Sequence, residues 1–262
     1  MDIRLSTFVQ RKIIFGNKKM KEMESLKDKK VVVIGGSAGI GLATAKSVAA
    51  KGGLVIIASA NQQRIDKALQ ELPAGSIGYA IDVTNEMQVK NLFERIGAFD
   101  HLVFTAGENL ILGNVADTTL EMARKYFNTR YWGAFAAVKY ATPFINTGGS
   151  IVLTSGIASN RPNKGWALGA SICAAMEGFA RAMAMELAPI RVNIVSPGVV
   201  KTALWDGMPE SERESMYTNI GNALPVKRVG EAEDIAKAFV YLLEQEYGTG
   251  QTLIIDGGTS LV

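Results

Sequence analysis

A glycine-rich turn between a strand and a helix constrains this chain more than any other feature. Residues 31–34, VVVI, suit a strand that is buried on both faces, as in a parallel sheet. Glycines follow at positions 35, 36, 39 and 41, and LATAKSVAA continues as good helix sequence. Such a turn offers a pyrophosphate free N–H groups and the positive end of a helix dipole. We expect a dinucleotide here; a tight turn without a ligand is the alternative.

Charge is distributed unevenly along the 262 residues. Residues 1–30 contain nine basic and four acidic residues, whereas the remainder contains 19 basic and 21 acidic ones. The basic excess therefore belongs to the beginning of the chain, and the rest shows none that would indicate nucleic acid binding. With 48% hydrophobic residues, the chain has enough apolar material for one large core.

The scarcity of cysteine and histidine excludes some classes of site. Cys173 is the single cysteine, which excludes an internal disulfide and fits a reducing compartment, so we expect a cytoplasmic protein. His101 is the single histidine, and no cluster of cysteine and histidine predicts a metal site. A membrane span is not expected, because no run of about 18 apolar residues occurs.

Strand and helix signals alternate from residue 30 to the end. The strand signals lie within residues 31–34, 54–59, 76–83, 100–107, 149–155, 190–198 and 252–258. Helix signals follow the glycine turn and cover residues 62–72, 85–96, 118–141, 166–187 and 231–243, with a polar segment at 209–222. Repeated β-α-β units predict an α/β fold: a single doubly wound domain at residues 30–262, with a seven-stranded parallel sheet and helices on both faces.

Residues 1–29 precede the first predicted strand and form a basic extension. We interpret them as a mobile tail, or as an over-long start with the true beginning at Met20 or Met23. A basic arm that touches a membrane or a partner is the alternative.

Further motifs stand at fixed places along the chain. They are IDVT (81–84), ELAPIRVN (186–193), SPGVVKT (196–202), RVGEAEDIA (228–236) and GQTLIIDGG (250–258). Together with GGSAGIG, their order and spacing resemble the short-chain dehydrogenase/reductase (SDR) family over residues 30–258. The resemblance implies a Rossmann-type fold, bound NAD(H) or NADP(H), and a homo-oligomer, either a dimer or a tetramer.

The resemblance also assigns cofactor contacts. The pyrophosphate turn matches Gly35, Ser37, Gly39, Ile40 and Gly41; the adenine positions match Asp82 and Val83; the end of the NNAG motif matches Ala106 and Gly107; and the nicotinamide loop matches Pro197, Gly198, Val200 and Thr202. After the second strand stand Ser59, Ala60 and Asn61, with no acidic residue to repel a 2′-phosphate. Ser59 and Asn61 can donate hydrogen bonds to one, and Arg64 follows on the next helix turn, so the sequence favours NADP(H) over NAD(H).

The chemical residues of the family are missing. Family members reduce carbonyls with a Tyr proton donor, a Lys four residues later, a Ser that holds the carbonyl oxygen and an Asn that supports a proton relay. These positions fall on Gly169, Cys173, Gly156 and Arg130 in this chain, and no tyrosine has a lysine four residues after it. A positioned general acid typically raises the reaction rate by about 10²–10⁴-fold, so we expect the usual carbonyl reduction to be very slow without it.

Three functions remain open. The first, which intact cofactor motifs favour, is an oxidoreductase of small or medium carbonyl or alcohol compounds, with Arg130, Ser155, Lys164 or water as a substituted proton donor. Arg130 can instead clamp a substrate carboxylate. The second is an NAD(P)(H)-binding sensor or scaffold without turnover, and the third is a lyase or isomerase.

Each candidate residue also has a purely structural interpretation. Gly169 and Cys173 lie at helical spacing and can form a stripe that lets helices pack closely. Arg130 can pair with an acidic neighbour, Ser155 can satisfy a strand end, and His101 is expected to be structural. Residues 208–222 are predicted to form a mobile lid over the nicotinamide site.

Overall fold

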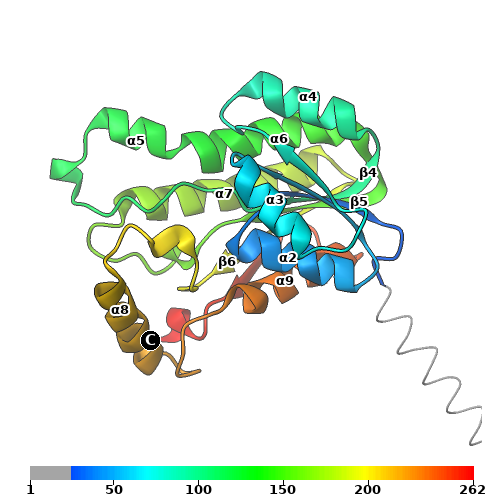
Figure 1. The fold of residues 1–262 in the computed structure, drawn as a ribbon. Coiled ribbons are helices and arrows are strands. Elements are labelled where there is room, and N and C mark those ends of the chain that lie inside the picture. The colour runs from blue at the N-terminus through cyan, green and yellow to red at the C-terminus, as the bar shows by residue number, and fades with distance from the viewer. Residues whose placement is uncertain (1–24) are drawn as a thin grey trace, which may run out of the picture.

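The computed structural model describes residues 25–262, which fold around one seven-stranded parallel sheet (Figure 1). The strand order is β3-β2-β1-β4-β5-β6-β7, so the direction of strand addition reverses between β1 and β4. All strand pairs are parallel. In doubly wound sheets, ligands bind outside the carboxyl ends of the strands at such a reversal. The predicted α/β fold and strand number are confirmed.

The elements follow the predicted alternation closely. The strands are β1 (Lys30–Ile34), β2 (Leu54–Ser59), β3 (Ile77–Ala80), β4 (Phe99–Phe104), β5 (Ile145–Thr154), β6 (Arg191–Pro197) and β7 (Thr252–Ile255). The helices are α2 (Gly39–Ala50), α3 (Gln62–Gln70), α4 (Glu86–Ile96), α5 (Leu120–Tyr126), α6 (Gly133–Ala141), α7 (Ala167–Glu186), α8 (Glu210–Ala223) and α9 (Ala232–Glu244).

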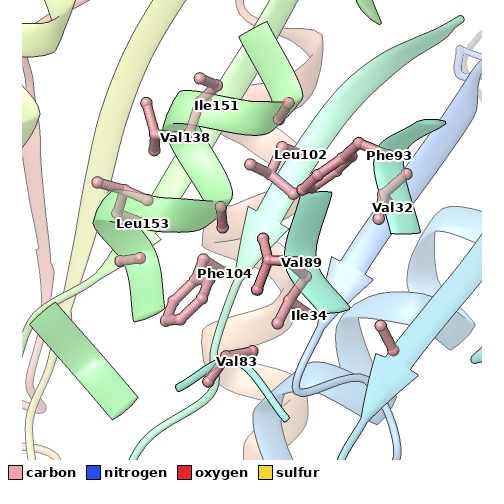
Figure 2. Packing of buried hydrophobic residues seen from close by; sticks show 14 of the residues in the cluster. Val32, Ile34, Val83, Val89, Phe93, Leu102, Phe104, Val138, Ile151 and Leu153 are labelled. Atoms are coloured by element: carbon pink, nitrogen blue, oxygen red, sulfur yellow. The ribbon is translucent and has the colours of Figure 1, made fainter. Parts of the chain in front are cut away.

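Two apolar cores cover the two faces of the sheet. Successive residues of a strand point to opposite faces, so in β1 Val32 and Ile34 join one core while Val31 and Val33 join the other. The first core packs α4, α6 and α7 onto the sheet, and Figure 2 shows Phe93 of α4 among its strand residues. The second core packs α2, α3 and α9 onto the opposite face. Burial on both faces explains why β1 has no polar alternation.

The described residues before β1 pack against the domain. Leu26 is buried in the core under α2, and its N–H donates to the carbonyl of Lys51. Leu26 thereby ties the residues just before β1 to the domain. The remainder of the predicted extension, residues 1–24, lies outside the described residues.

Two predicted segments differ in detail from the structure. The helix expected over 118–141 is divided by a π-helical turn, Asn128–Trp132, between α5 and α6. The polar segment expected at 209–222 is the helix α8. Tyr217 of α8 packs against Trp205 in a small separate core, which holds α8 beside the carboxyl end of β6.

Candidate active site

The glycine turn after β1 has the backbone geometry that a pyrophosphate requires. Gly35 and Gly39 have positive φ angles of 86° and 51°, which residues other than glycine rarely adopt. A Cβ on Gly41 would lie 2.2 Å from the carbonyl oxygen of Gly35, so only glycine fits at that position. Helix α2 begins at Gly39 without a side-chain cap or an acidic residue in its first turn. The N–H groups of its first turn therefore have no side-chain cap, and the helix start suits an anionic ligand.

Polar groups at the end of β2 lie beside this turn. The Ser37 hydroxyl donates to the Ser59 hydroxyl at 2.8 Å, which ties the turn to β2. The Asn61 side-chain oxygen accepts from the Arg64 N–H and caps α3, leaving its NH₂ group available. The Arg64 side chain lines a cleft together with Gly39 and Gly41. The end of β2 therefore places polar side chains and the Arg64 residue beside the glycine turn.

One cleft joins the glycine turn to the carboxyl ends of β4, β5 and β6. Among the expected cofactor residues, its lining includes Gly39, Ile40, Gly41, Gly107, Pro197, Gly198, Val200 and Thr202. Gly35, Ser37, Ser59, Asn61, Asp82, Val83 and Ala106 lie outside that lining. The Asp82 carboxylate accepts from the N–H and the hydroxyl of Thr84, and Val83 is buried in the core.

Comparison with known proteins agrees with this geometry. A family model described as Enoyl-(Acyl carrier protein) reductase matches residues 35–260. The short-chain dehydrogenase/reductase ATR9 of Stachybotrys chlorohalonatus is 32% identical over 254 residues, covering 91% of this chain and 100% of the relative. The 3-oxoacyl-[acyl-carrier-protein] reductase of Homo sapiens is 35% identical over 243 residues, covering 90% and 99%. This chain belongs to the short-chain dehydrogenase/reductase family.

Solved SDR structures have the same fold. A small-chain dehydrogenase in complex with NADPH has a TM-score of 0.77 and 36% identity, covering 90% of this chain and 100% of that chain. The MalC reductase/Diels-Alderase of Malbranchea aurantiaca has a TM-score of 0.85 and 28% identity, covering 92% and 100%. The NADPH complex supports a dinucleotide of the NAD(P) type for the SDR cleft described here.

The four positions that the SDR resemblance assigns to chemistry come together in the cleft. Arg130, Gly156, Gly169 and Cys173 all belong to its lining. A Cβ on Gly156 would lie 3.1 Å from the Cys173 sulfur, and a Cβ on Gly169 would lie 3.9 Å from the hydroxyl oxygen of Tyr126. Burial raises the pKa of the Cys173 thiol, while the Arg130 guanidinium acts in the opposite direction. The thiol is therefore predominantly protonated at neutral pH.

Ser155, one of the two predicted catalytic residues, is buried at the end of β5. Its hydroxyl lies 2.8 Å from a carboxylate oxygen of Glu177 and 3.1 Å from the carbonyl oxygen of Cys173. Ser159 donates to the same Glu177 oxygen at 2.6 Å. These contacts join the end of β5 to α7. Lys164, the third candidate, is exposed and lies outside the cleft lining.

Arg130, the other predicted catalytic residue, is held by a residue that the sequence analysis did not select. One carboxylate oxygen of Glu108, in the loop after β4, accepts from the N–H groups of Thr129 and Arg130 at 2.6 and 3.0 Å. These N–H groups lie at the π-helical turn, and such turns are frequent at functional sites. The guanidinium lies over Gly107, where a Cβ would be 2.6 Å from one of its nitrogens.

Tyr126 is a second residue that the sequence analysis missed. It is the last residue of α5, is 2% exposed, and lines the cleft. Its hydroxyl has no hydrogen-bond partner within residues 25–262. Its sequence signal is the spacing to Arg130, which follows Tyr126 by four residues, as Lys follows Tyr in the SDR pattern.

The remaining predicted features have simple structural roles or lie away from the cleft. His101 on β4 is buried and shares a 2.8 Å hydrogen bond with the Ser150 hydroxyl. Burial lowers the pKa of His101 to about 4. Between residues 25 and 262, no group of three metal-ligating side chains gathers, and no helix is long and apolar enough to cross a membrane.

Proposed function

We propose that this SDR protein is an NADP(H)-dependent oxidoreductase of a small or medium carbonyl or alcohol compound, with a proton donor other than the usual tyrosine. One observation carries the proposal: a single cleft connects the glycine turn with the nicotinamide loop and the four chemical positions. When bound, the dinucleotide supplies or accepts the hydride. The residues of the chain orient both reactants and supply the proton.

The preference for NADP(H) over NAD(H) rests on the end of β2. No carboxylate stands at positions 59–61 to accept ribose hydroxyls. Arg64 lines the cleft next to the glycine turn and exposes a guanidinium that can pair with a 2′-phosphate. We expect Arg64→Ala to weaken NADPH binding about tenfold and to leave NADH binding unchanged, because only NADPH carries the phosphate.

The proton donor is proposed to be among Arg130, Ser155 and a residue or water beside them. Arg130 presents its guanidinium to the cleft, whereas the Ser155 hydroxyl is directed to Glu177 and the carbonyl of Cys173. Of these two residues, Arg130 is therefore the better placed to contact the substrate. Its planar fork also suits a substrate carboxylate.

The substrate side of the cleft is largely apolar. Leu110 and Leu112 contribute from the loop after β4, Trp166 from the start of α7, and Leu204 and Trp205 from the segment before α8. This lining favours a compound with an apolar body and one oxygen near Arg130. We propose that residues 208–222, mainly α8, close over the compound as a lid. Equal hydrogen exchange of α8 with and without NADPH would contradict the lid.

The alternative without turnover is favoured by the glycines at positions 156 and 169, which provide no hydroxyl. A sensor or scaffold would bind NADPH but reduce no carbonyl. A lyase or isomerase would convert its compound without a change in dinucleotide absorbance. Measuring NADPH binding, dinucleotide absorbance and conversion of the compound together therefore distinguishes the three functions.

Titration calorimetry with NADPH, NADP⁺, NADH and NAD⁺ is the first test, followed by a carbonyl and alcohol screen. Cys173 is a built-in reporter because it is the single cysteine and lines the cleft. We expect micromolar binding of NADPH and slower methyl methanethiosulfonate modification of Cys173 when NADPH is present. No binding of any dinucleotide would overturn the proposed function.

We further propose a cytoplasmic homo-oligomer. Trp132, Phe135 and Met185 are 56%, 43% and 83% exposed on the helices that cover one face of the sheet. Large apolar side chains in this number favour contact with a second copy. Light scattering at micromolar concentration tests this, and a monomer mass would contradict it. The cytoplasmic assignment rests on the single cysteine.

A further inference from the structure

We propose that Tyr126 donates the proton to the substrate oxygen and that Arg130 supplies the positive charge beside it, so that one pair on α5 and the π-helical turn replaces the missing pair on α7. The proposal deepens the proposed function and rests on it. Tyr126 and Arg130 are four residues apart, which matches the spacing of Tyr and Lys in SDR proteins that reduce carbonyls. In this chain the two groups come from α5 and the π-helical turn, whereas the positions of the usual pair lie on α7.

The position of the Tyr126 hydroxyl is the first support. The side chain is 98% buried between Ile172 and Cys173 of α7 and other apolar residues, so it is held firmly. Its hydroxyl has no partner in the described chain and lies 3.9 Å from where a Cβ of Gly169 would be. Although the residue is only 2% exposed, its hydroxyl oxygen is not fully buried and opens into the cleft, where a ligand or water can bind it. The absence of a side chain at Gly169 leaves the space in which a substrate oxygen can do so.

The position of the Arg130 guanidinium is the second support. It lies between Gly107 and Cys173, and it has no ion-pair partner among residues 25–262. Glu108 binds the backbone at Thr129 and Arg130 through its carboxylate, rather than pairing with the guanidinium. The guanidinium contacts Cys173 and acts as a positive charge on the Tyr126 phenol. Such a charge stabilises the phenolate that proton donation leaves behind. Arg130 thereby takes the role of the missing lysine at position 173.

The proposed step balances atoms and charge. In the reducing direction, the carbonyl carbon receives a hydride from the reduced dinucleotide and the C=O π bond opens. The oxygen takes the proton of the Tyr126 hydroxyl, and the alcohol leaves. Water then returns a proton to the phenolate, which the Arg130 guanidinium has stabilised. Alcohol oxidation follows the same path in reverse.

The first experiment measures NADPH-dependent reduction of two probes, 9,10-phenanthrenequinone and acetophenone. We expect Tyr126→Phe, which removes only the hydroxyl, to lower kcat for the reduced probe by about 10²–10⁴-fold while the NADPH Kd stays within twofold. Arg130→Met should lower kcat strongly, and Arg130→Lys should recover part of it. Tyr131→Phe is the matched control, because Tyr131 packs beside Phe127 and Phe179 and does not line the cleft.

The second experiment needs neither dinucleotide nor substrate. In protein labelled with ¹³C at the tyrosine Cζ carbon, the Tyr126 signal is the one of seven that Tyr126→Phe removes. The charged or ionisable groups that act on this phenol are Arg130, Glu108 and Cys173. We expect Arg130→Met to move the Tyr126 titration upward by at least about half a pH unit, and Arg130→Lys to leave it near the original midpoint.

The outcomes separate the two proposals. Absence of NADPH binding overturns the proposed function, and calorimetry shows this independently of Tyr126. If NADPH binds but Tyr126→Phe reduces a probe as fast as the unchanged protein, or neither probe is reduced, Tyr126 is not the donor. An unchanged Tyr126 titration in Arg130→Met overturns the pairing with Arg130, whichever result the kinetics give.

Discussion

The two halves of the cleft follow the SDR pattern to very different extents. The half around the glycine turn matches the pattern in residue type and in backbone geometry, with positive φ angles at Gly35 and Gly39. In the other half, the positions that the resemblance assigns to the Tyr and Lys of the family are Gly169 and Cys173, which line the cleft. The first half depends on backbone atoms and on space, and the second depends on particular side-chain atoms. A functional side-chain group can come from another element that lines the cleft, whereas no other segment can replace the backbone geometry of the turn.

The largest effect is expected from Gly41→Ala, which adds one methyl group to the glycine turn. The Cβ would lie 2.2 Å from the Gly35 carbonyl oxygen and 2.5 Å from the Thr105 hydroxyl, so the turn must open. We expect a loss of about 3 kcal/mol in the free energy of unfolding and loss of NADPH binding. Urea unfolding and calorimetry measure the two effects.

Gly178→Ala is the matched control for that substitution. Gly178 lies within α7, is exposed, and has no atom within 4 Å of an added Cβ. Alanine should stabilise this helix position by about 0.5–1 kcal/mol. Equal NADPH binding by the Gly41→Ala and Gly178→Ala proteins would contradict the claim that the dinucleotide half is fixed by its backbone.

Unfolding at lowered pH tests whether the two halves of the cleft unfold together. The titrating group is His101, which lies on the central strand β4 that both halves share. Its pKa is lowered from 6.5 to about 4 by burial, so the unfolded chain binds the proton more readily. The resulting stability is complete above about pH 6.5 and is lost as the pH falls towards 4. We expect a loss of about 2 kcal/mol between pH 7 and pH 5.

Urea unfolding at these two pH values measures the loss, and His101→Gln should remove most of it. The carboxylates with lowered pKa values, such as Asp234 at about 2, titrate below this window, and the chain has no second histidine. Separate transitions for Trp fluorescence and for NADPH binding would show that the two halves unfold independently.

Gly107→Ala is expected to act mainly on the substrate half through Arg130, although the resemblance also assigns Gly107 to the cofactor. Its Cβ would lie 2.6–3.2 Å from three atoms of the Arg130 guanidinium, and a flexible side chain can move away at little cost to the fold. The guanidinium would then leave its position beside Cys173. We expect kcat to fall about tenfold, with stability within about 0.5 kcal/mol and the NADPH Kd within threefold. An unchanged kcat would mean that the placement of Arg130 over Gly107 is irrelevant to the reaction.

The sequence predicted the fold and the dinucleotide half because both have local signals. Buried strands such as β1 are continuous apolar runs, and the turn glycines are required by contacts within a few residues. The substrate half was predicted only in part. Arg130 was selected by its alignment with the family's asparagine, but the contact of Glu108 with the π-helical turn joins two segments about 20 residues apart. Tyr126 was missed because its role depends on the empty space at Gly169, which is 43 residues away in the chain.

Ser155→Ala should give the smallest effect and separates the two catalytic residues that the sequence predicted. The hydroxyl lies between the Glu177 carboxylate and the Cys173 carbonyl, so its loss removes contacts that join β5 to α7. Ser159 still donates to Glu177, which limits the cost to about 1 kcal/mol of unfolding free energy. Because this hydroxyl is already engaged by Glu177 and the Cys173 carbonyl, we expect kcat to change by less than about threefold. A loss of 100-fold in kcat at unchanged stability would instead place the proton donor at the end of β5, and the substrate half would then resemble the usual SDR site more closely than Tyr126 and Arg130 suggest.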